Sequence, residues 1–320
     1  MCHHNLADAC DGKRTKEEDM TNSNSRSRTV RRARGHVAST LFVLLALASL
    51  VCASALTACA GSSSDSSSSA SKSASGSSSK KTLVVAMELA YPPFETKTDS
   101  GEPDGVSVQF IKDFGEAYGY DVVIQNTAWD GLIPSLVTGQ ADCVISSMTI
   151  TDERAQTVDF SEPYAVAQLA ILANANSNIS SIDDLNQPGK TVAVKTGSTG
   201  DTYATNNLTN ATIVRLADES ACVTEVSQGK ADGFLYDQLT IYREQKSNPG
   251  TTKAVYIAFQ DPEKWGIAVQ KGNTELLGQL NEFIETSKTD GEYDKLTDKY
   301  LSEEKAAFDE LGFKWFFDLS

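Results

Sequence analysis

The stretch SSMTITDERAQTVDFSEPY, residues 146–164, decides how the rest of the chain is interpreted. The apolar residues 143–145 that precede it are typical of a short buried strand. Thr151, followed by two acidic residues, is a typical helix start, because its hydroxyl can cap the first turn and acids favour that turn. The stretch therefore predicts a strand end, a loop rich in hydroxyl groups, and a short helix that carries Arg154 in its first turn.

Arg154 is a candidate for binding a carboxylate. Ser146, Ser147 and Thr149 lie just before it and offer hydroxyl and backbone N–H groups. A bidentate guanidinium combined with such donors makes a good seat for a carboxylate. The alternative is an ordinary ion pair with a neighbouring acidic residue, as surface arginines often form. The rest of the chain has to decide between the two.

Strands and helices alternate around this stretch. Strands are expected at 82–87, 121–125 and 141–146, and helices at 106–118 and 132–137. Such alternation predicts an α/β fold with parallel strand pairing, in which ligands bind beyond the carboxyl ends of the strands. Five further residues fall just past expected strand ends: Glu88, Tyr91, Trp129, Ser146 and Ser147. Their convergence favours a binding role for Arg154.

A second, smaller α/β lobe is expected to begin near residue 189. An expected strand at 189–195 is followed by the glycine-rich turn 196–200 and then a helix, whose N-terminus would expose backbone N–H groups to an anion. This turn lacks the spacing of a phosphate loop or a dinucleotide fingerprint, and by itself such a turn is usually only a turn. A further expected strand, 231–236, ends at Asp237.

The N-terminal 58 residues are interpreted as a leader and signal peptide. A region rich in arginine precedes an apolar stretch at 40–55, and the sequence Leu-Thr-Ala-Cys closes it at Cys59. This ending resembles a bacterial lipobox, which implies cleavage before Cys59 and a lipid on its sulfur. A membrane-spanning helix is the alternative, but the apolar run is shorter than the roughly 20 residues that span a bilayer comfortably. Met20 is an alternative start of translation.

The serine-rich segment that ends at residue 81 cannot bury a core and is expected to be a flexible tether. The formal net charge of −15 argues against nucleic-acid binding, which needs clustered positive charge. All three histidines fall in the segment to be removed, which excludes histidine-based catalytic triads and zinc sites from the rest. We expect no metal or other cofactor. Cys143 and Cys222 are expected to be small buried residues, and a disulfide between them is left open.

Six segments together resemble one protein family. They are YPPFE at 91–95, WDGLIPSL at 129–136, SSMTITDER at 146–154, DFS at 159–161, VAVKTG at 192–197 and GEY at 291–293. In this order they are similar to the extracellular solute-binding proteins of polar amino acid ABC transporters, of the glutamine- and basic-amino-acid-binding type. The resemblance covers about residues 82–300. It implies a two-lobe periplasmic-binding-protein-like α/β fold that closes about a hinge over one amino acid.

The resemblance also implies how the charged ends of an amino acid are held. Arg154 would bind the α-carboxylate, assisted by Thr149 and the backbone N–H of Thr199. Asp237 and the carbonyl of Ser147 would receive the α-ammonium. These roles suit a zwitterion, which needs a fixed cation and a fixed anion desolvated together.

The side chain of the ligand would lie between Tyr91 and Trp129, although ordinary core packing is the alternative for both aromatic residues. Glu88 and Lys195 would meet the tip of the ligand side chain. A basic ligand would meet Lys195 unfavourably and an acidic ligand would meet Glu88. We therefore expect a neutral polar amino acid, such as glutamine.

Two chain crossings would divide the folded part into a first lobe at 82–173 and 265–320 and a second lobe at 174–264. Residues 1–58 are the leader and signal peptide, and residues 59–81 are the lipidated cysteine and linker. A lipid-anchored monomer on the outer face of the cell membrane, delivering its ligand to permease subunits, is the expected function. There are two alternatives: a cyclohexadienyl-dehydratase-like enzyme on the same fold, and a ligand-sensing module. A lipid anchor and a tether favour neither of them.

Overall fold

The computed structural model describes residues 80–319. The predicted signal peptide, Cys59 and nearly all of the serine-rich linker lie outside the described residues. Within residues 80–319, no helix has the length and apolar character needed to cross a membrane.

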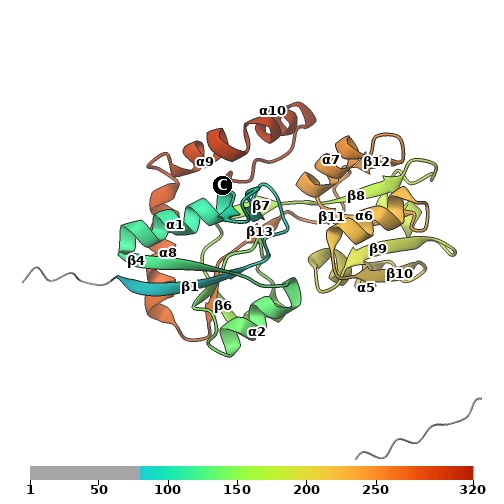
Figure 1. The fold of residues 1–320 in the computed structure, drawn as a ribbon. Coiled ribbons are helices and arrows are strands. Elements are labelled where there is room, and N and C mark those ends of the chain that lie inside the picture. The colour runs from blue at the N-terminus through green and yellow to red at the C-terminus, as the bar shows by residue number, and fades with distance from the viewer. Residues whose placement is uncertain (1–79, 320) are drawn as a thin grey trace, which may run out of the picture. The chain divides into compact units, whose positions relative to one another are not determined.

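The first lobe is built on a five-stranded sheet with the strand order β4-β1-β5-β14-β6 (Figure 1). β1 pairs in parallel with β4 and β5, whereas β14 runs antiparallel to both β5 and β6. The strands are β1 (Lys81–Met87), β4 (Tyr120–Asn126), β5 (Cys143–Val144), β6 (Val158–Phe160) and β14 (Ala268–Gln270). The purely parallel pairing expected from the sequence is therefore wrong for this sheet, because β14 belongs to the returning chain.

Helices cover the two faces of this sheet, as the alternation of side chains along β1 dictates. Leu83, Val85 and Met87 face one cluster of buried residues together with α1, whereas Ala86 faces another together with α2. The helices and short elements of this part are α1 (Val106–Tyr118), η1 (Trp129–Gly131), α2 (Leu132–Val137), α3 (Asp152–Ala155) and the β2 (Thr96–Lys97) and β3 (Pro103–Asp104) hairpin.

The second lobe contains another five-stranded mixed sheet, in the order β10-β9-β11-β8-β12. Its strands are β8 (Leu169–Asn174), β9 (Thr191–Lys195), β10 (Thr212–Leu216), β11 (Gly233–Asp237) and β12 (Thr252–Val255). Its helices are α4 (Ile182–Leu185), α5 (Thr199–Asn207), α6 (Glu219–Ser227) and α7 (Gln238–Ser247). β9 pairs in parallel with β10 and β11, and β8 runs antiparallel to β11 and β12.

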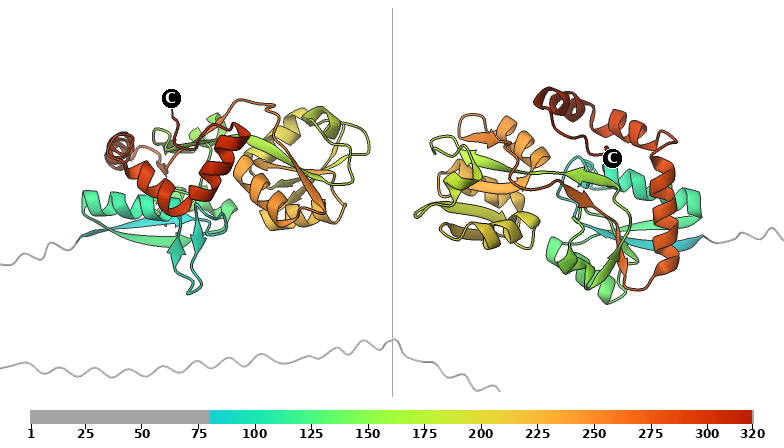
Figure 2. Two further views of the ribbon diagram at one scale, coloured as in Figure 1. Left: turned by 90° about the horizontal axis from the view of Figure 1, so that it is seen from above. Right: turned by 180° about the vertical axis from the view of Figure 1, so that it is seen from behind.

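Two short antiparallel strands join the lobes. β7 (Ala165–Ala167) carries the chain out of the first sheet, and β13 (Glu263–Trp265) carries it back, with Trp265 paired to Ala165 (Figures 1 and 2). The first crossing falls between β7 and β8, earlier than the boundary at residue 173 that the sequence suggested. The reason is that β8 forms its hydrogen bonds with strands of the second sheet.

Three C-terminal helices follow the return to the first lobe. They are α8 (Thr274–Ser287), α9 (Glu292–Tyr300) and α10 (Ser302–Leu311). The aromatic tail behind them packs on the folded part, since Phe316 is fully buried and the centre of its ring is 5.0 Å from that of Phe94. The carbonyl of Phe316 also accepts a hydrogen bond from Val166 N (2.8 Å), so the tail is fixed to hinge strand β7.

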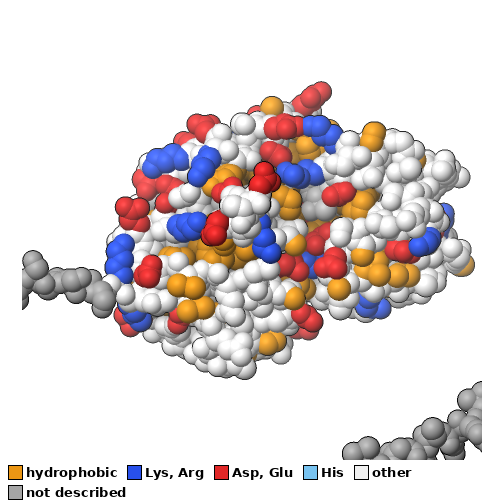
Figure 3. Space-filling view, in the orientation of Figure 1, with side chains coloured by type: hydrophobic (Ala, Val, Ile, Leu, Met, Phe, Trp, Pro, Cys, Tyr) orange, Lys and Arg blue, Asp and Glu red, His pale blue; other side chains and the backbone are white. Residues whose placement is uncertain are grey.

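Cys143 and Cys222 are both buried and free, in separate clusters of buried residues. The face of the molecule in Figure 3 carries acidic and basic side chains side by side, without a broad basic patch.

Candidate ligand-binding site

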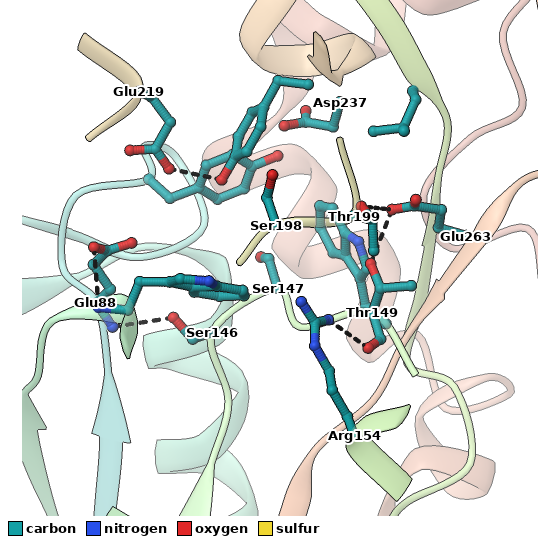
Figure 4. A pocket seen from close by; sticks show the side chains of 15 residues that line it. Glu88, Ser146, Ser147, Thr149, Arg154, Ser198, Thr199, Glu219, Asp237 and Glu263 are labelled. Atoms are coloured by element: carbon teal, nitrogen blue, oxygen red, sulfur yellow. Dashed lines mark hydrogen bonds between the residues drawn. The ribbon is translucent and has the colours of Figure 1, made fainter. Parts of the chain in front are cut away.

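A cavity between the lobes contains about 470 Å³ of empty space, part of which opens to solvent. Nine of the ten binding residues suggested by the sequence line it. These are Glu88, Tyr91, Trp129, Ser146, Ser147, Thr149, Arg154, Thr199 and Asp237. Lys195 is the exception. Leu169, Ser198, Glu219, Tyr236, Glu263 and Trp265 also line the cavity (Figure 4).

Arg154 lies in α3, whose first turn is capped by the Thr151 hydroxyl, which accepts a hydrogen bond from Arg154 N (3.2 Å). Its guanidinium donates to the carbonyl of Thr149 (2.7 Å) and, across the cavity, to the carbonyl of Gly197 in the second lobe (3.1 Å). It forms no salt bridge within residues 80–319, so the ion-pair alternative is not what the structure shows. Burial lowers the pKa of Arg154, although the nearby Glu263 carboxylate opposes this shift.

Ser147 is held in an unusual backbone conformation. Its φ of 48° lies in the left-handed region, and it is the only residue other than glycine within 80–319 with a positive φ. Its hydroxyl donates to both oxygens of Glu95 (3.1 and 3.0 Å), and its N–H donates to the hydroxyl of Tyr164 (3.2 Å). Glu95 is fully buried, which raises its pKa to about 8. Glu95 and Tyr164 therefore support the backbone of the site from behind.

Asp237 ends β11 and caps α7. Its Oδ1 accepts from the backbone N–H groups of Leu239 (2.9 Å) and Thr240 (3.0 Å), and its Oδ2 accepts from the Thr240 hydroxyl (3.0 Å). Burial raises the pKa of Asp237 to about 6. The buried hydroxyl of Tyr91, in the same cavity, has no hydrogen-bond partner within residues 80–319. This arrangement fixes a carboxylate from the second lobe at the cavity wall.

Lys195 is fully buried and sits between two carboxylates. Its ammonium pairs with Glu88 of the first lobe and with Oε1 of Glu219 (2.8 Å) in the second lobe. The hydroxyl of Tyr236 donates to the same Oε1 (2.7 Å). Burial by itself would lower the pKa of Lys195, but the two carboxylates outweigh burial and raise it. The lysine therefore lies behind the carboxylates and not on the cavity surface.

Trp129 lies close to both cationic side chains. The guanidinium of Arg154 is 5.3 Å and the ammonium of Lys195 is 5.2 Å from the centre of its ring. Both distances are within the range of cation–π attraction. One ring of the cavity wall is therefore within reach of both Arg154 and the Lys195 cluster.

Glu263, in hinge strand β13, links the two lobes. Its Oε2 accepts from the hydroxyl of Thr149 (2.9 Å) in the first lobe and from that of Thr199 (2.9 Å) in the second. Its other oxygen accepts from Gln260 (2.9 Å). Thr199 is the first residue of α5, which Ser198 caps by accepting from Asp201 N (3.1 Å).

Sequence reasoning missed Glu95, Glu219 and Glu263. Glu219 is an acidic residue in the first turn of a helix, which is a common capping signal and gives no sign of a pocket. Glu95 belongs to the YPPFE segment, but its position there gives no sign of a role behind the site, and Glu263 lies in a segment whose local pattern carries no binding signal. Only tertiary packing brings Glu219 and Glu263 to the cavity and places Glu95 behind Ser147.

The chain is similar to known proteins over most of the part that the structure describes. Residues 83–303 match the family described as bacterial extracellular solute-binding proteins, family 3. A probable histidine-binding protein of Neisseria gonorrhoeae is 33% identical over 70% of this chain and 84% of its own length. The L-cystine-binding protein TcyJ of Escherichia coli (strain K12) is 31% identical over 69% of this chain and 82% of its own. The solved structure of an ancestral arginine-binding protein bound to arginine is 35% identical, with a TM-score of 0.65, and the match covers 70% of this chain and 99% of that structure.

Proposed function

Because the chain belongs to the bacterial extracellular solute-binding proteins of family 3, we propose that it captures one amino acid between its two lobes and delivers it to the permease of an ABC transporter. The relatives reported above are named as binding proteins, which confirms the expectation that the chain is not an enzyme.

The observation that carries the proposal is a pair of opposite charges on facing walls of one cavity. Arg154 comes from the first lobe and Asp237 from the second, and both line the cavity. An amino acid is a zwitterion that can span such a pair, and its binding would hold the lobes together. A ligand with only one of the two charges would leave a buried charge without a partner, which is costly.

In this proposal the α-carboxylate binds to Arg154, assisted by Thr149 and by the backbone N–H of Thr199 at the start of α5. The positive end of the α5 dipole favours an anion at that place. Asp237 and the carbonyl of Ser147 receive the α-ammonium. The left-handed backbone of Ser147, fixed by Glu95, supports this role because it sets the direction of that carbonyl.

Tyr91 and Trp129 flank the ligand side chain in this proposal. The alternative of core packing applies in part to Tyr91, whose ring also packs edge-on against Trp265 at 5.9 Å. The tip of the ligand side chain points toward Glu88, which pairs with Lys195.

The sequence suggested a neutral polar ligand such as glutamine, because the charges of Glu88 and Lys195 both seemed within reach of the ligand. Lys195, however, does not line the cavity.

We further propose that the mature protein is a monomer anchored to the outer face of the membrane by a lipid on Cys59, with residues 61–81 as the tether. The lipobox-like sequence that ends at Cys59 supports the anchor. In Cys59→Ala, processing should fail or the protein should leave the membrane fraction. A variant that matures normally and stays with the membrane would rule the anchor out.

The binding function is tested by thermal unfolding of the purified protein with each of the twenty amino acids in turn. A ligand that binds only the folded state raises its stability by about 2.7 kcal/mol at one hundred times its Kd. We expect a raised Tm with at least one polar amino acid and calorimetric binding of the same one. The proposal fails if no amino acid raises the Tm.

A further inference from the structure

The two ends of the cavity differ in charge. In Figure 4, Arg154 and Glu263 lie at one end, whereas Glu88 and Glu219 lie at the other. An amino acid whose α-carboxylate is held at Arg154 would therefore point the tip of its side chain toward Glu88 and Glu219.

The far end carries one more negative charge than positive. Lys195 faces two carboxylates, Glu88 and Glu219, and no other cationic side chain among the described residues forms a salt bridge with either of them. Because the ammonium is fully buried behind them, a ligand meets carboxylate oxygens first. Burial also raises the pKa of Glu88, so a second cation near it would be stabilising.

Glu219 has acceptor capacity that the protein does not use. Its Oε1 accepts from Lys195 and from the hydroxyl of Tyr236, whereas its Oε2 accepts no hydrogen bond from any described residue. An ionised carboxylate at a cavity wall can accept further N–H donors, and those from a charged donor are about twice as strong as those from a neutral one. The far end therefore has room for one more hydrogen-bond donor, and a positively charged donor would bind most strongly there.

We propose that Glu219 selects the ligand by charge, so that the site prefers an amino acid whose side chain ends in a cationic N–H donor, a guanidinium or an ammonium, over a neutral one of the same shape. This inference rests on the proposed amino-acid-binding function. The cationic ligand replaces the neutral one that the sequence suggested. That earlier expectation assumed that Lys195 lies on the cavity surface, where it would repel a basic ligand, whereas Lys195 does not line the cavity. An acidic side chain would meet two carboxylates and is excluded.

The test compares L-arginine with L-citrulline, in which a neutral ureido group of the same shape replaces the guanidinium. Calorimetry on the purified protein should show arginine binding about tenfold more tightly, the difference between a charge-assisted and a neutral hydrogen bond. Citrulline binding as tightly as arginine would overturn the inference. So would tight binding of glutamine with no binding of arginine or lysine, although the proposed function would then stand.

Glu219→Gln assigns the preference to this residue. The variant should lose about tenfold in affinity for arginine while its affinity for citrulline changes less than threefold, so that the preference disappears. Glu225→Gln is the matched control, because Glu225 lies on the same helix and pairs with Lys230 (3.3 Å) away from the cavity. It should leave both affinities unchanged.

An equal loss of affinity for both ligands in Glu219→Gln would mean that Glu219 only holds Lys195 in place, and the inference would be wrong. Circular dichroism checks that the variant is folded. If it is not, the arginine and citrulline affinities of the parent protein still decide the question. Failure of every amino acid to bind the parent would instead refute the proposed function itself.

Discussion

At the scale of single residues, the site depends on charged groups that the fold has taken out of water. Arg154 is partly buried, and its guanidinium donates to two backbone carbonyls, with the Glu263 carboxylate nearby. Neutral acceptors compensate a partly buried cation only in part, so a carboxylate at this place would be stabilising. This makes Arg154 the residue whose loss should matter for every ligand.

We expect Arg154→Ala to weaken binding of all amino acid ligands, whatever their side chain. Truncating one partner of a buried, hydrogen-bonded charge pair costs about 2–5 kcal/mol, or roughly 30-fold to several thousandfold in Kd. Calorimetry with a ligand panel measures this. Lys195→Ala is the contrasting variant and should change the ranking among ligands. Near-parental affinity in a folded Arg154→Ala protein would show that Arg154 does not bind the ligand.

Glu95 should make the stability of the protein depend on pH. Burial raises its pKa from 4.5 to about 8, so between these values the folded state keeps a proton that the unfolded state releases. The folded state then binds more protons, and the free energy of unfolding falls as the pH rises toward 8 and levels off above it. Glu95→Gln is neutral at every pH and should remove this contribution.

The measurement is thermal unfolding of parent and variant between pH 6 and 8. Asp237 contributes in the same direction, but its pKa of about 6 confines its effect to lower pH. An identical decline of stability in Glu95→Gln over this interval would mean that another group is responsible.

At the scale of elements, hinge strand β13 does more than connect the lobes. One oxygen of Glu263 accepts a hydrogen bond from a threonine hydroxyl of each lobe. Both hydrogen bonds can form at once only when Thr149 and Thr199 are brought together. Because both threonines belong to the end of the cavity near Arg154, the strand connects lobe closure to the place where we propose that the ligand backbone binds.

We expect Glu263→Ala to weaken all amino acid ligands by a similar factor, about fivefold to a hundredfold for two lost hydrogen bonds. Glu263→Gln should retain most of the affinity, since its amide oxygen can accept from both hydroxyls. Binding of several ligands to the two variants measures this. Equal losses in both variants would indicate that the negative charge matters and not the two bonds.

At the scale of the whole folded part, few contacts join the walls of the cavity. Arg154 donates to Gly197 and Lys195 pairs with Glu88, each across the gap between the lobes. Two lobes joined by a pair of short strands can move about a hinge, and a ligand that contacts both lobes shifts the population toward the closed form.

We expect the radius of gyration to fall when the preferred L-amino acid is added, because few contacts hold the lobes together without it and the ligand would contact both. Small-angle X-ray scattering with and without saturating ligand measures this change. The D-enantiomer is the control and should have no effect, since its amine and carboxylate cannot both reach their partners. An unchanged radius at saturation would count against hinge closure.

The sequence by itself determined what depends on neighbouring residues. The short helix at Arg154, its Thr151 cap and several strands of both sheets follow from local periodicity and capping. Family resemblance added the hinge between the two lobes, the cavity residues Thr199 and Asp237, and the roles proposed for the other residues of the site.

Only the tertiary structure decided what depends on long-range packing. It assigned β8 to the second sheet and ran β14 antiparallel in the first. It also placed Glu219 beside Lys195 and Glu263 beside two threonines, and put Glu95 behind Ser147. No local pattern records these contacts, because each joins residues far apart in the chain and forms only when separate elements pack together. For that reason the sequence could point to the end of the cavity proposed to bind the ligand backbone, whereas the charge of the opposite end follows from the fold.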